Sequence, residues 1–566
     1  MNNNRIDLKQ ISFLFAFQIT LLPSLMLSIT ALSFTLGIPI TLFHLPLSLI
    51  LTVGLSYIFS RDKKGLFFKT TALFLVMLLG FFIISTMIYD FSFDGQVYHQ
   101  PAVILLTSGW NPFYYHFLGD QCIEFYQAAG NVAPLIEHFT KGSWILGSGI
   151  YALTGNLEGG KMFHLLFIVG AFMTTLYFLC NLSRIGTKTK LLIALLAALN
   201  PVCLYQVFSF YNDGLLSSML TVLIMASAAF ILKGERKALI LTAAAIPILS
   251  NIKFTGIIYS GVVIGLVCVW LFFRNRNRLI KYMLTNGIIL IVSGLFLGYQ
   301  PYITNIIHNS NPFYPAIMFG KISNGAVETI EIGQAPKNFL NQNRFVKLGY
   351  SVLSKTTNQL RENPELKIPF SIYKREIAAL GYTDSRYGGF GPLFGGTILL
   401  IMLYGVTACR WRRRVFVLFL TGIGFILFSI LINPEAWWAR LSPQLWLLPL
   451  LFITACFYTS NHKKINRYTA WVMIAILLVN CGVVFGSYLG YNLEMNGIYK
   501  KQLSRMGNVS KGMNIEYGVD PSAVSLSLEY RLKSYGVRFQ FMKTHDIENT
   551  VPIKGTFGAV YWEEKQ

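Results

Sequence analysis

The sequence predicts an all-α polytopic membrane protein with about 13 transmembrane helices, external loops and a small external C-terminal α/β tail. Of the 566 residues, 54% are hydrophobic and only 13% are charged, whereas a soluble domain carries about one quarter charged residues. The chain contains a series of apolar runs, most of them long enough to cross the ~30 Å hydrocarbon core of a bilayer. Basic residues gather at every second junction between these runs.

The apolar runs define the expected helices in order. No small-residue cleavage site separates the first run from the second, so we expect a retained helix and not a removed signal peptide. The run at 238–251 is the shortest and is compatible with one half of a broken helix. The expected spans are roughly 11–33, 38–59, 66–89, 161–180, 191–209, 214–232, 238–251, 255–273, 284–300, 393–409, 415–432, 442–459 and 468–489.

Basic residues at every second junction set the orientation. Lys and Arg collect in cytoplasmic loops of membrane proteins, which places the N-terminus inside and the C-terminus outside. The same rule explains much of the net charge of +22, so we expect no nucleic-acid partner. The basic junctions are 5–9, 61–64, 184–190, 233–237, 274–281, 410–414 and 463–467.

This orientation leaves three larger segments outside, at 90–160, at 301–392 and from about 490 to the end. The first contains short amphipathic pieces at 131–139 and 143–153, which we expect to lie along the membrane interface. We see no eukaryotic sorting signal and therefore expect a bacterial cytoplasmic (inner) membrane with the functional site on its external side. The division of the chain is 1–65 for an N-terminal transmembrane hairpin, 66–490 for the central transmembrane domain and 491–566 for the external tail.

The tail has mixed secondary-structure signals. A helix is predicted at 521–535, and strand-like pieces lie at 537–542 and 556–562. These pieces predict a small α/β unit.

Acidic side chains near the external end of the third span are the first candidates for chemistry. Asp90 and Asp94 lie among aromatic residues at this junction. Partial desolvation raises the basicity of a carboxylate, which suits a general base that accepts a proton from a hydroxyl. An Asp that only caps a helix end is an equally good interpretation of the pattern.

Two basic residues near the external surface are candidates for phosphate binding. Lys253 joins two short apolar runs, and an ammonium there is costly unless it meets an anion or reaches the interface. Arg440 stands in a short outer loop, and a guanidinium can hold a phosphate through two parallel hydrogen bonds. Simple snorkelling of Lys253 and an ion pair of Arg440 with Glu435 are the alternatives. Asp213 is a candidate site residue or a helix cap.

The remaining candidates bind substrate. Tyr98 and His99 follow Asp94, while His308 and Arg386 lie in the second external segment, whose glycines suit a loop that closes over a substrate. The seven cysteines form no CxxC pair and predict neither a disulfide framework nor a zinc site. No cofactor is expected.

Several of these stretches resemble the GT-C superfamily of multi-helix glycosyltransferases, which use polyprenyl-phosphate sugars and include protein O-mannosyltransferases and lipid A aminoarabinose transferases. Residues 94–101, which follow an Asp-x-x-x-Tyr-His-x-Pro pattern, are similar to a stretch of uncharacterised bacterial members. Residues 251–256 and 438–440 are also similar to stretches in such proteins, and the likeness in architecture covers roughly 66–490.

The resemblance implies a glycosyltransferase that moves a sugar from an isoprenyl-phosphate donor to an acceptor hydroxyl, with inversion, on the outer face of the membrane. The acceptor would be an envelope glycan, lipid or protein, with membrane lipids as further partners. In this reading Asp94 is the base, and Lys253 and Arg440 stabilise the departing lipid phosphate.

The chain departs from the family pattern in three ways. The acidic loop follows the third helix instead of the first, which makes residues 11–59 an extra hairpin. The Asp-Glu pair of several branches is absent, which leaves Asp90 as an alternative base. No Asp-x-Asp stretch is present, so a metal-free mechanism is expected.

Three other functions compete with this interpretation. A transporter or lipid flippase would need polar groups along a path through the membrane and often two related halves, but the ionisable residues gather at the helix ends. An envelope polysaccharide polymerase or ligase would also act outside, on a diphosphate-linked oligosaccharide. A catalytically silent assembly protein would keep the fold without consuming a lipid-linked sugar.

Overall fold

The computed structural model describes residues 8–114, 133–315, 336–339, 342–359, 362–405, 413–459, 464–513, 516–519, 526–541, 550–556 and 559–563. Arg410 and Arg412 of one basic junction, and residues 521–525 of the predicted tail helix, lie outside them. Long helices dominate, which confirms the predicted fold class of a polytopic helical protein with a small C-terminal α/β unit.

Every predicted apolar run contains a helix. Within the described residues, seven helices are long and apolar enough to cross a membrane, and four shorter apolar helices accompany them; the total of 13 spans stays a prediction. The helices of these runs are α1 (Leu8–Thr35), α2 (His44–Ile58), α3 (Lys64–Met87), α8 (Met162–Leu179), α9 (Thr187–Ala198), α11 (Asp213–Lys233), α12 (Arg236–Ile252), α13 (Phe254–Arg274), α14 (Arg276–Val292), α19 (Phe394–Gly405), α20 (Arg413–Leu431), α21 (Leu447–Thr459) and α22 (Lys464–Met513).

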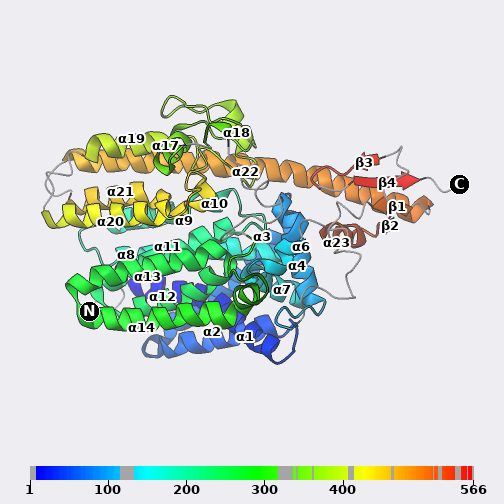
Figure 1. The fold of residues 1–566 in the computed structure, drawn as a ribbon, viewed down its shortest axis with the longest axis horizontal. Coiled ribbons are helices and arrows are strands. Elements are labelled where there is room, and N and C mark those ends of the chain that lie inside the picture. The colour runs from blue at the N-terminus through cyan, green and yellow to red at the C-terminus, as the bar shows by residue number, and fades with distance from the viewer. Residues whose placement is uncertain are drawn as a thin grey trace.

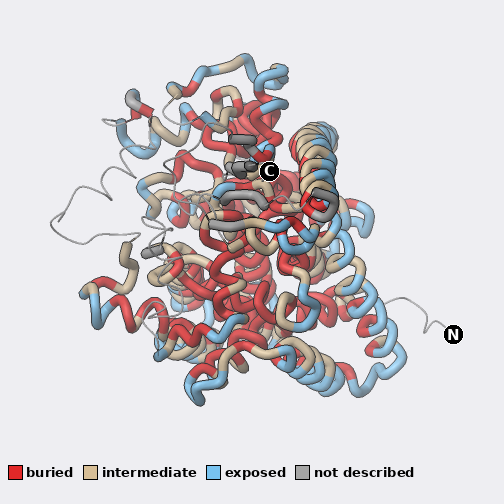
Figure 2. The backbone as a smooth tube through the Cα atoms, turned by 90° about the vertical axis from the view of Figure 1, so that its right-hand side faces the viewer, coloured by how far each residue is buried: buried red, intermediate tan, exposed pale blue. Residues whose placement is uncertain are grey.

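The helices lie side by side along the long axis of the molecule (Figure 1). Interior and peripheral helices differ in burial. In the most apolar stretch of α1, 78% of the residues are buried, against 22% in the corresponding stretches of α3 and α14. The peripheral helices expose large apolar side chains such as Phe68 and Phe273, and buried residues fill the centre when the bundle is viewed from its end (Figure 2). Apolar side chains on the outside and a packed centre are what a lipid environment requires.

Two breaks interrupt the helical runs of the bundle. The predicted run 191–209 is interrupted at Asn200, whose side-chain oxygen accepts a hydrogen bond from the backbone N–H of Val202 and caps α10 (Pro201–Leu204). Proline suits the first position of that helix because it has no N–H to leave unpaired. Lys253 has an extended backbone between α12 and α13, so the run at 238–251 is a complete helix that ends there.

Short helices cover the end of the bundle where the predicted external segments lie. Of the predicted amphipathic pieces, 131–139 contains a helix at 133–138, with 131 and 132 outside the described residues, and 143–153 lies within a helix; their place along the membrane interface stays a prediction. The short helices are α4 (Gln100–Thr107), α6 (Ala133–His138), α7 (Gly142–Thr154), α15 (Thr304–Asn309), α17 (Arg344–Leu353) and α18 (Lys374–Ala379).

The C-terminal unit begins as a continuation of α22, which passes the proposed boundary at residue 491 without a break. Beyond it lie α23 (Leu526–Ser534) and a sheet of four strands in the order β2-β1-β4-β3, in which only β1 and β2 are parallel. This unit lies at the same end of the bundle as α4, α6 and α7 (Figure 1). The strands are β1 (Glu516–Val519), β2 (Phe539–Phe541), β3 (Thr550–Pro552) and β4 (Ala559–Glu563).

Candidate active site

The segment that follows α3 is fixed by Asp90. This residue is fully buried, and its two carboxylate oxygens accept hydrogen bonds from the backbone N–H groups of Ser92 (2.8 Å) and Phe210 (2.8 Å). Burial raises the pKa of Asp90 to about 6. Because both oxygens accept hydrogen bonds from backbone N–H groups, Asp90 connects this segment to the loop before α11.

Asp94 stands at the start of a short π-helical turn, Gly95–His99, that leads into α4. Burial raises the pKa of Asp94, while nearby Arg440 and a hydrogen bond from the Tyr98 hydroxyl favour the ionised form. The net effect is a carboxylate of increased basicity beside a cation. Such a group can accept a proton from a hydroxyl at neutral pH.

Arg440 lies among carboxylates that come from distant parts of the chain. Its Nη1 atom is 3.7 Å from Oδ2 of Asp213, and its Nε atom is 3.7 Å from Oδ1 of Asp384. Its guanidinium lies 4.0 Å from the centroid of the Trp438 ring, a distance that gives a cation–π attraction. Although burial disfavours the charged form, the carboxylates raise the pKa of Arg440 above its ordinary value. The side chain is therefore a permanent cation.

The ion pairs of Arg440 are too long for charge-assisted hydrogen bonds, which measure about 2.7–2.9 Å. Its Nε–H group is buried and has no hydrogen-bond acceptor in the described parts of the chain, and an unpaired buried donor costs about 1–3 kcal/mol. An incoming anion would satisfy this donor. The alternative pairing with Glu435 is not the one observed, because Glu435 accepts a hydrogen bond from the indole of Trp437.

Lys253 forms a close ion pair with Asp213 at the break between α12 and α13. The Asp213 side chain is only 3% exposed, whereas that of Lys253 is 30% exposed. Lys253 therefore faces the same carboxylate as Arg440 from the open side of the cluster. The structure favours this pairing over simple snorkelling of an isolated lysine.

Asp384, Trp438 and Arg386 complete the cluster. The Trp438 indole N–H donates a hydrogen bond to Oδ1 of Asp384 (3.0 Å), and Arg386 lies 3.4 Å from the other oxygen of Asp384. Arg386 also lies 4.4 Å from the centroid of the Trp438 ring. The sequence analysis did not include Asp384 or Trp438 among its site residues, although the Asp-Ser-Arg and Trp-Ala-Arg triplets that contain them were visible signals.

The other predicted site residues divide into two kinds. Tyr98 and His99 are buried beside Asp94, and Nδ1 of His99 accepts a hydrogen bond from the Trp144 indole (2.6 Å). Burial lowers the pKa of His99 to about 3, so this imidazole is neutral. His308 is an exposed residue of α15, and the described ion pairs and ring contacts of the Arg440 cluster do not include it. No group of three His, Cys, Asp or Glu side chains in the described ranges is suited to hold a metal ion.

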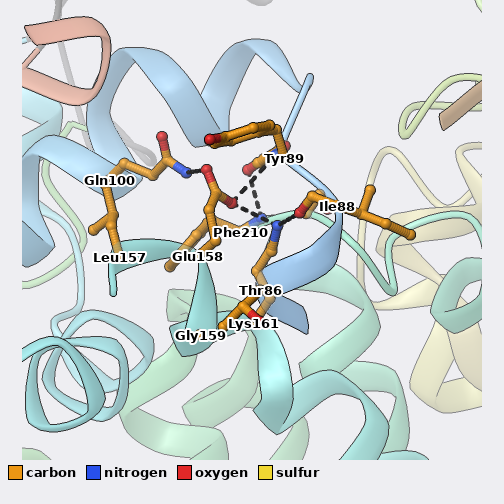
Figure 3. Close-up of polar contacts among 12 residues, drawn as sticks. Thr86, Ile88, Tyr89, Gln100, Leu157, Glu158, Gly159, Lys161 and Phe210 are labelled. Atoms are coloured by element: carbon orange, nitrogen blue, oxygen red, sulfur yellow. Dashed lines mark hydrogen bonds and ion pairs between the residues drawn. The ribbon is translucent and has the colours of Figure 1, made fainter. Parts of the chain in front are cut away.

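A second buried ionic cluster was missed by the sequence analysis. Glu158 lies 2.5 Å from Lys161 and 2.7 Å from Arg531 of α23, and Figure 3 shows its carboxylate among Gln100, Tyr89 and Lys161. The charged pair at the start of the fourth apolar run was a readable signal for part of this cluster. Arg531 gave no such signal, because its place in the sequence is typical of a surface residue of a tail helix.

No family model matches the sequence, and no curated protein matches it. Among solved structures, the chain is similar to the crystal structure of ArnT from Cupriavidus metallidurans in the apo state. The two chains are 13% identical, the alignment covers 84% of this chain and 86% of that chain, and the TM-score is 0.43. A likeness at this level assigns no role to an individual residue, so the proposals below rest on the side chains of this chain.

Proposed function

We propose that the chain is a GT-C-type membrane glycosyltransferase that transfers a sugar from an isoprenyl-phosphate donor to an acceptor hydroxyl. The observation that carries the proposal is the buried Nε–H of Arg440, which lacks an acceptor and lies within a cluster that also holds Asp94 and Lys253. A site with a permanent cation, an unpaired donor and a basic carboxylate suits a reaction in which a phosphate leaves and a hydroxyl attacks.

The proposed reaction uses these groups in a single displacement. Asp94 accepts the proton of the acceptor hydroxyl, and the oxygen attacks the anomeric carbon of the sugar. The bond between that carbon and the phosphate oxygen breaks, and the electron pair leaves with the lipid phosphate. Arg440 and Lys253 stabilise the charge that develops on this leaving group. A single displacement of this kind inverts the anomeric centre.

The surroundings of the site supply the remaining roles. We propose that Tyr98 holds Asp94 by its hydrogen bond, that Asp213 places Lys253 and Arg440, and that Arg386 contacts the substrate next to Trp438. We propose that the site opens on the external side of the membrane, as the basic junctions predict, and that this membrane is a bacterial cytoplasmic membrane. His308 and Asp90 stay in the proposal only as a peripheral contact and as the alternative base.

Sugar transfer from a panel of synthetic polyprenyl-phosphate sugars to envelope acceptors tests the proposed function. Turnover of one donor by the purified protein in detergent or lipid nanodiscs would support it. Turnover of only diphosphate-linked oligosaccharides would favour the polymerase or ligase. Movement of an intact lipid-linked sugar across vesicles, with no transfer, would favour a flippase.

The pH dependence of sugar transfer should show the titration of the Asp94 carboxylate. Because the pKa of Asp94 is raised by burial, kcat/KM should fall as the pH drops through a value above the ordinary pKa of Asp, about 4. The donor phosphodiester stays ionised in this range, and His99 stays neutral. A pH–rate profile of wild type and Asp94→Asn measures this, and the acid limb should be absent from the residual activity of the variant.

Asp90 titrates in the same range and needs a control. Its folded-state pKa is raised above the unfolded value, so protonation of Asp90 favours the folded state and the associated stability is lost as pH rises through about 6. Loss of activity at acid pH therefore does not come from unfolding through Asp90. Thermal unfolding of the wild type across the same pH values checks this. An acid limb that persists in Asp94→Asn would contradict the assignment.

A further inference from the structure

The C-terminal unit contacts residues 88–107, the stretch that carries Asp94 and is called here the base segment. At its start, the Asn496 side chain accepts a hydrogen bond from the backbone N–H of Tyr89 (3.0 Å) and donates one to the carbonyl of Met87 (2.9 Å). Asn496 lies on the part of α22 that extends beyond the proposed boundary at 491. The long helix thus fixes the point where the chain leaves α3.

Arg531 of α23 reaches the centre of the base segment. Its side chain is fully buried, and its Nη2 group donates to the carbonyl of Asp90 (3.0 Å), to the side-chain oxygen of Gln100 (3.2 Å) and to Glu158 (2.7 Å). The guanidinium also lies 5.1 Å from the ring centroid of Tyr89. One residue of the C-terminal unit therefore contacts the base segment on both sides of Asp94.

The contacts of Arg531 with the base segment also depend on the negative charge of Glu158. Its carboxylate accepts hydrogen bonds from the backbone N–H of Asp90 (3.2 Å) and from the Gln100 amide (3.1 Å), while it pairs with Lys161. Figure 3 shows Gln100 and Lys161 converging on Glu158 from different elements. Removal of one partner from a buried ionic group leaves a charge uncompensated, which disturbs every group that shares it.

A second contact from the same unit reaches the turn that bears the base. The Ser527 hydroxyl donates a hydrogen bond to the carbonyl of Gln96 (3.0 Å), and the Gln96 amide donates to the carbonyls of Asp90 (3.0 Å) and Gly555 (2.8 Å). Gln96 is two residues from Asp94. The C-terminal unit therefore binds the backbone of the base segment before and within the π-helical turn, and the side chain of Gln100 after it.

We propose that Arg531 is a positioning residue that holds the base segment, and with it Asp94, in its place near the Arg440 cluster. This inference rests on the proposed function for its catalytic consequence, although the structural part stands without it. Arg531 touches neither substrate nor reacting atoms and acts through Asp90, Gln100 and Glu158. The C-terminal unit is thereby part of the active enzyme.

The test compares the full-length variants Arg531→Met and Arg531→Lys with Lys533→Met, a control on the same helix whose side chain is 65% exposed. Hydrogen exchange should become about tenfold faster in the base segment of Arg531→Met, and kcat should fall about 100-fold with a donor KM close to the wild-type value. Arg531→Lys keeps the charge but replaces the planar guanidinium with a compact ammonium on a flexible stem, so it should be intermediate. Lys533→Met should match the wild type.

Ser527→Ala provides a second variant if Arg531→Met does not fold. It removes only the hydroxyl that binds Gln96, so faster exchange confined to 95–99 would support the proposal. Unchanged exchange and kcat in Arg531→Met would overturn it, and so would exchange that rises equally in α8 and α11. If the exchange effect appears but the wild type transfers no sugar, the proposed function fails and the positioning role stands. If transfer occurs without any exchange effect, the positioning role alone fails.

Discussion

The Asp94→Asn enzyme should transfer sugar about 10²- to 10⁴-fold more slowly than the wild type, which is the usual contribution of a general base. The substitution keeps the size of the side chain and leaves an oxygen that can accept the hydrogen bond from Tyr98. It also removes one of the negative charges near Arg440, so donor binding should be equal to or tighter than in the wild type. Steady-state kinetics should therefore show a loss in kcat with an unchanged or lower donor KM.

Asp62→Asn is the matched control, because Asp62 is an exposed carboxylate in the short turn before α3. It should transfer sugar at the wild-type rate. Wild-type turnover by Asp94→Asn would remove Asp94 from the mechanism and make Asp90 the next carboxylate to test. A parallel loss of kcat and thermal stability would instead indicate a structural role for Asp94.

The fold was readable from the sequence because the bilayer imposes simple rules. A spanning segment must satisfy its own backbone hydrogen bonds, so each long apolar run had to be a helix. The alternation of basic junctions also predicts an orientation from local sequence, and that orientation stays a prediction. The limits of the helices were less accessible: the break at Asn200 and the unbroken passage of α22 beyond 490 depend on local capping and on packing of the tail.

The site was only partly readable because its charges meet through tertiary structure. Asp94, Lys253 and Arg440 could be proposed from the sequence, since each is an ionisable group at the predicted external end of an apolar run. Their convergence on Asp213 and Asp384 depends on how α11 and the loop before α19 are placed, and no local pattern encodes that. Buried ion pairs such as the Arg531 cluster are hidden for the same reason.

The charged side chains of the candidate site are close to electrically balanced. Arg440, Lys253 and Arg386 face Asp94, Asp213 and Asp384, so each buried charge has an opposite neighbour, which limits the cost of desolvation. Lys253 is hydrogen-bonded to Asp213, but the two 3.7 Å separations show that Arg440 takes part through Coulombic attraction and not through formed hydrogen bonds. A donor phosphate can therefore gain new hydrogen bonds from Arg440 without first breaking short ones.

Arg440→Ala should weaken donor binding about 10- to 100-fold, since hydrogen bonds to charged groups contribute about 1.5–3 kcal/mol. Arg440→Lys should be nearly as weak, because an ammonium keeps the charge but lacks the Nε–H group and the planar contact with Trp438. Donor affinity measured by displacement of a fluorescent lipid-phosphate sugar reports the change. Arg375→Lys is the control, because Arg375 is exposed and pairs with Glu362.

A neutral donor separates phosphate recognition from general damage to the site. With a methyl phosphotriester in place of the phosphodiester, the wild type should lose most of its affinity. Arg440→Ala should lose clearly less, because only Lys253 is left to bind the phosphate charge. The difference between the two losses isolates the interaction of the guanidinium with the phosphate charge, because effects of the substitution on folding or on lipid-tail binding cancel between donors. If Arg440→Ala discriminated between the donors as well as the wild type, the phosphate would be held elsewhere, and Lys253 would be the first residue to examine.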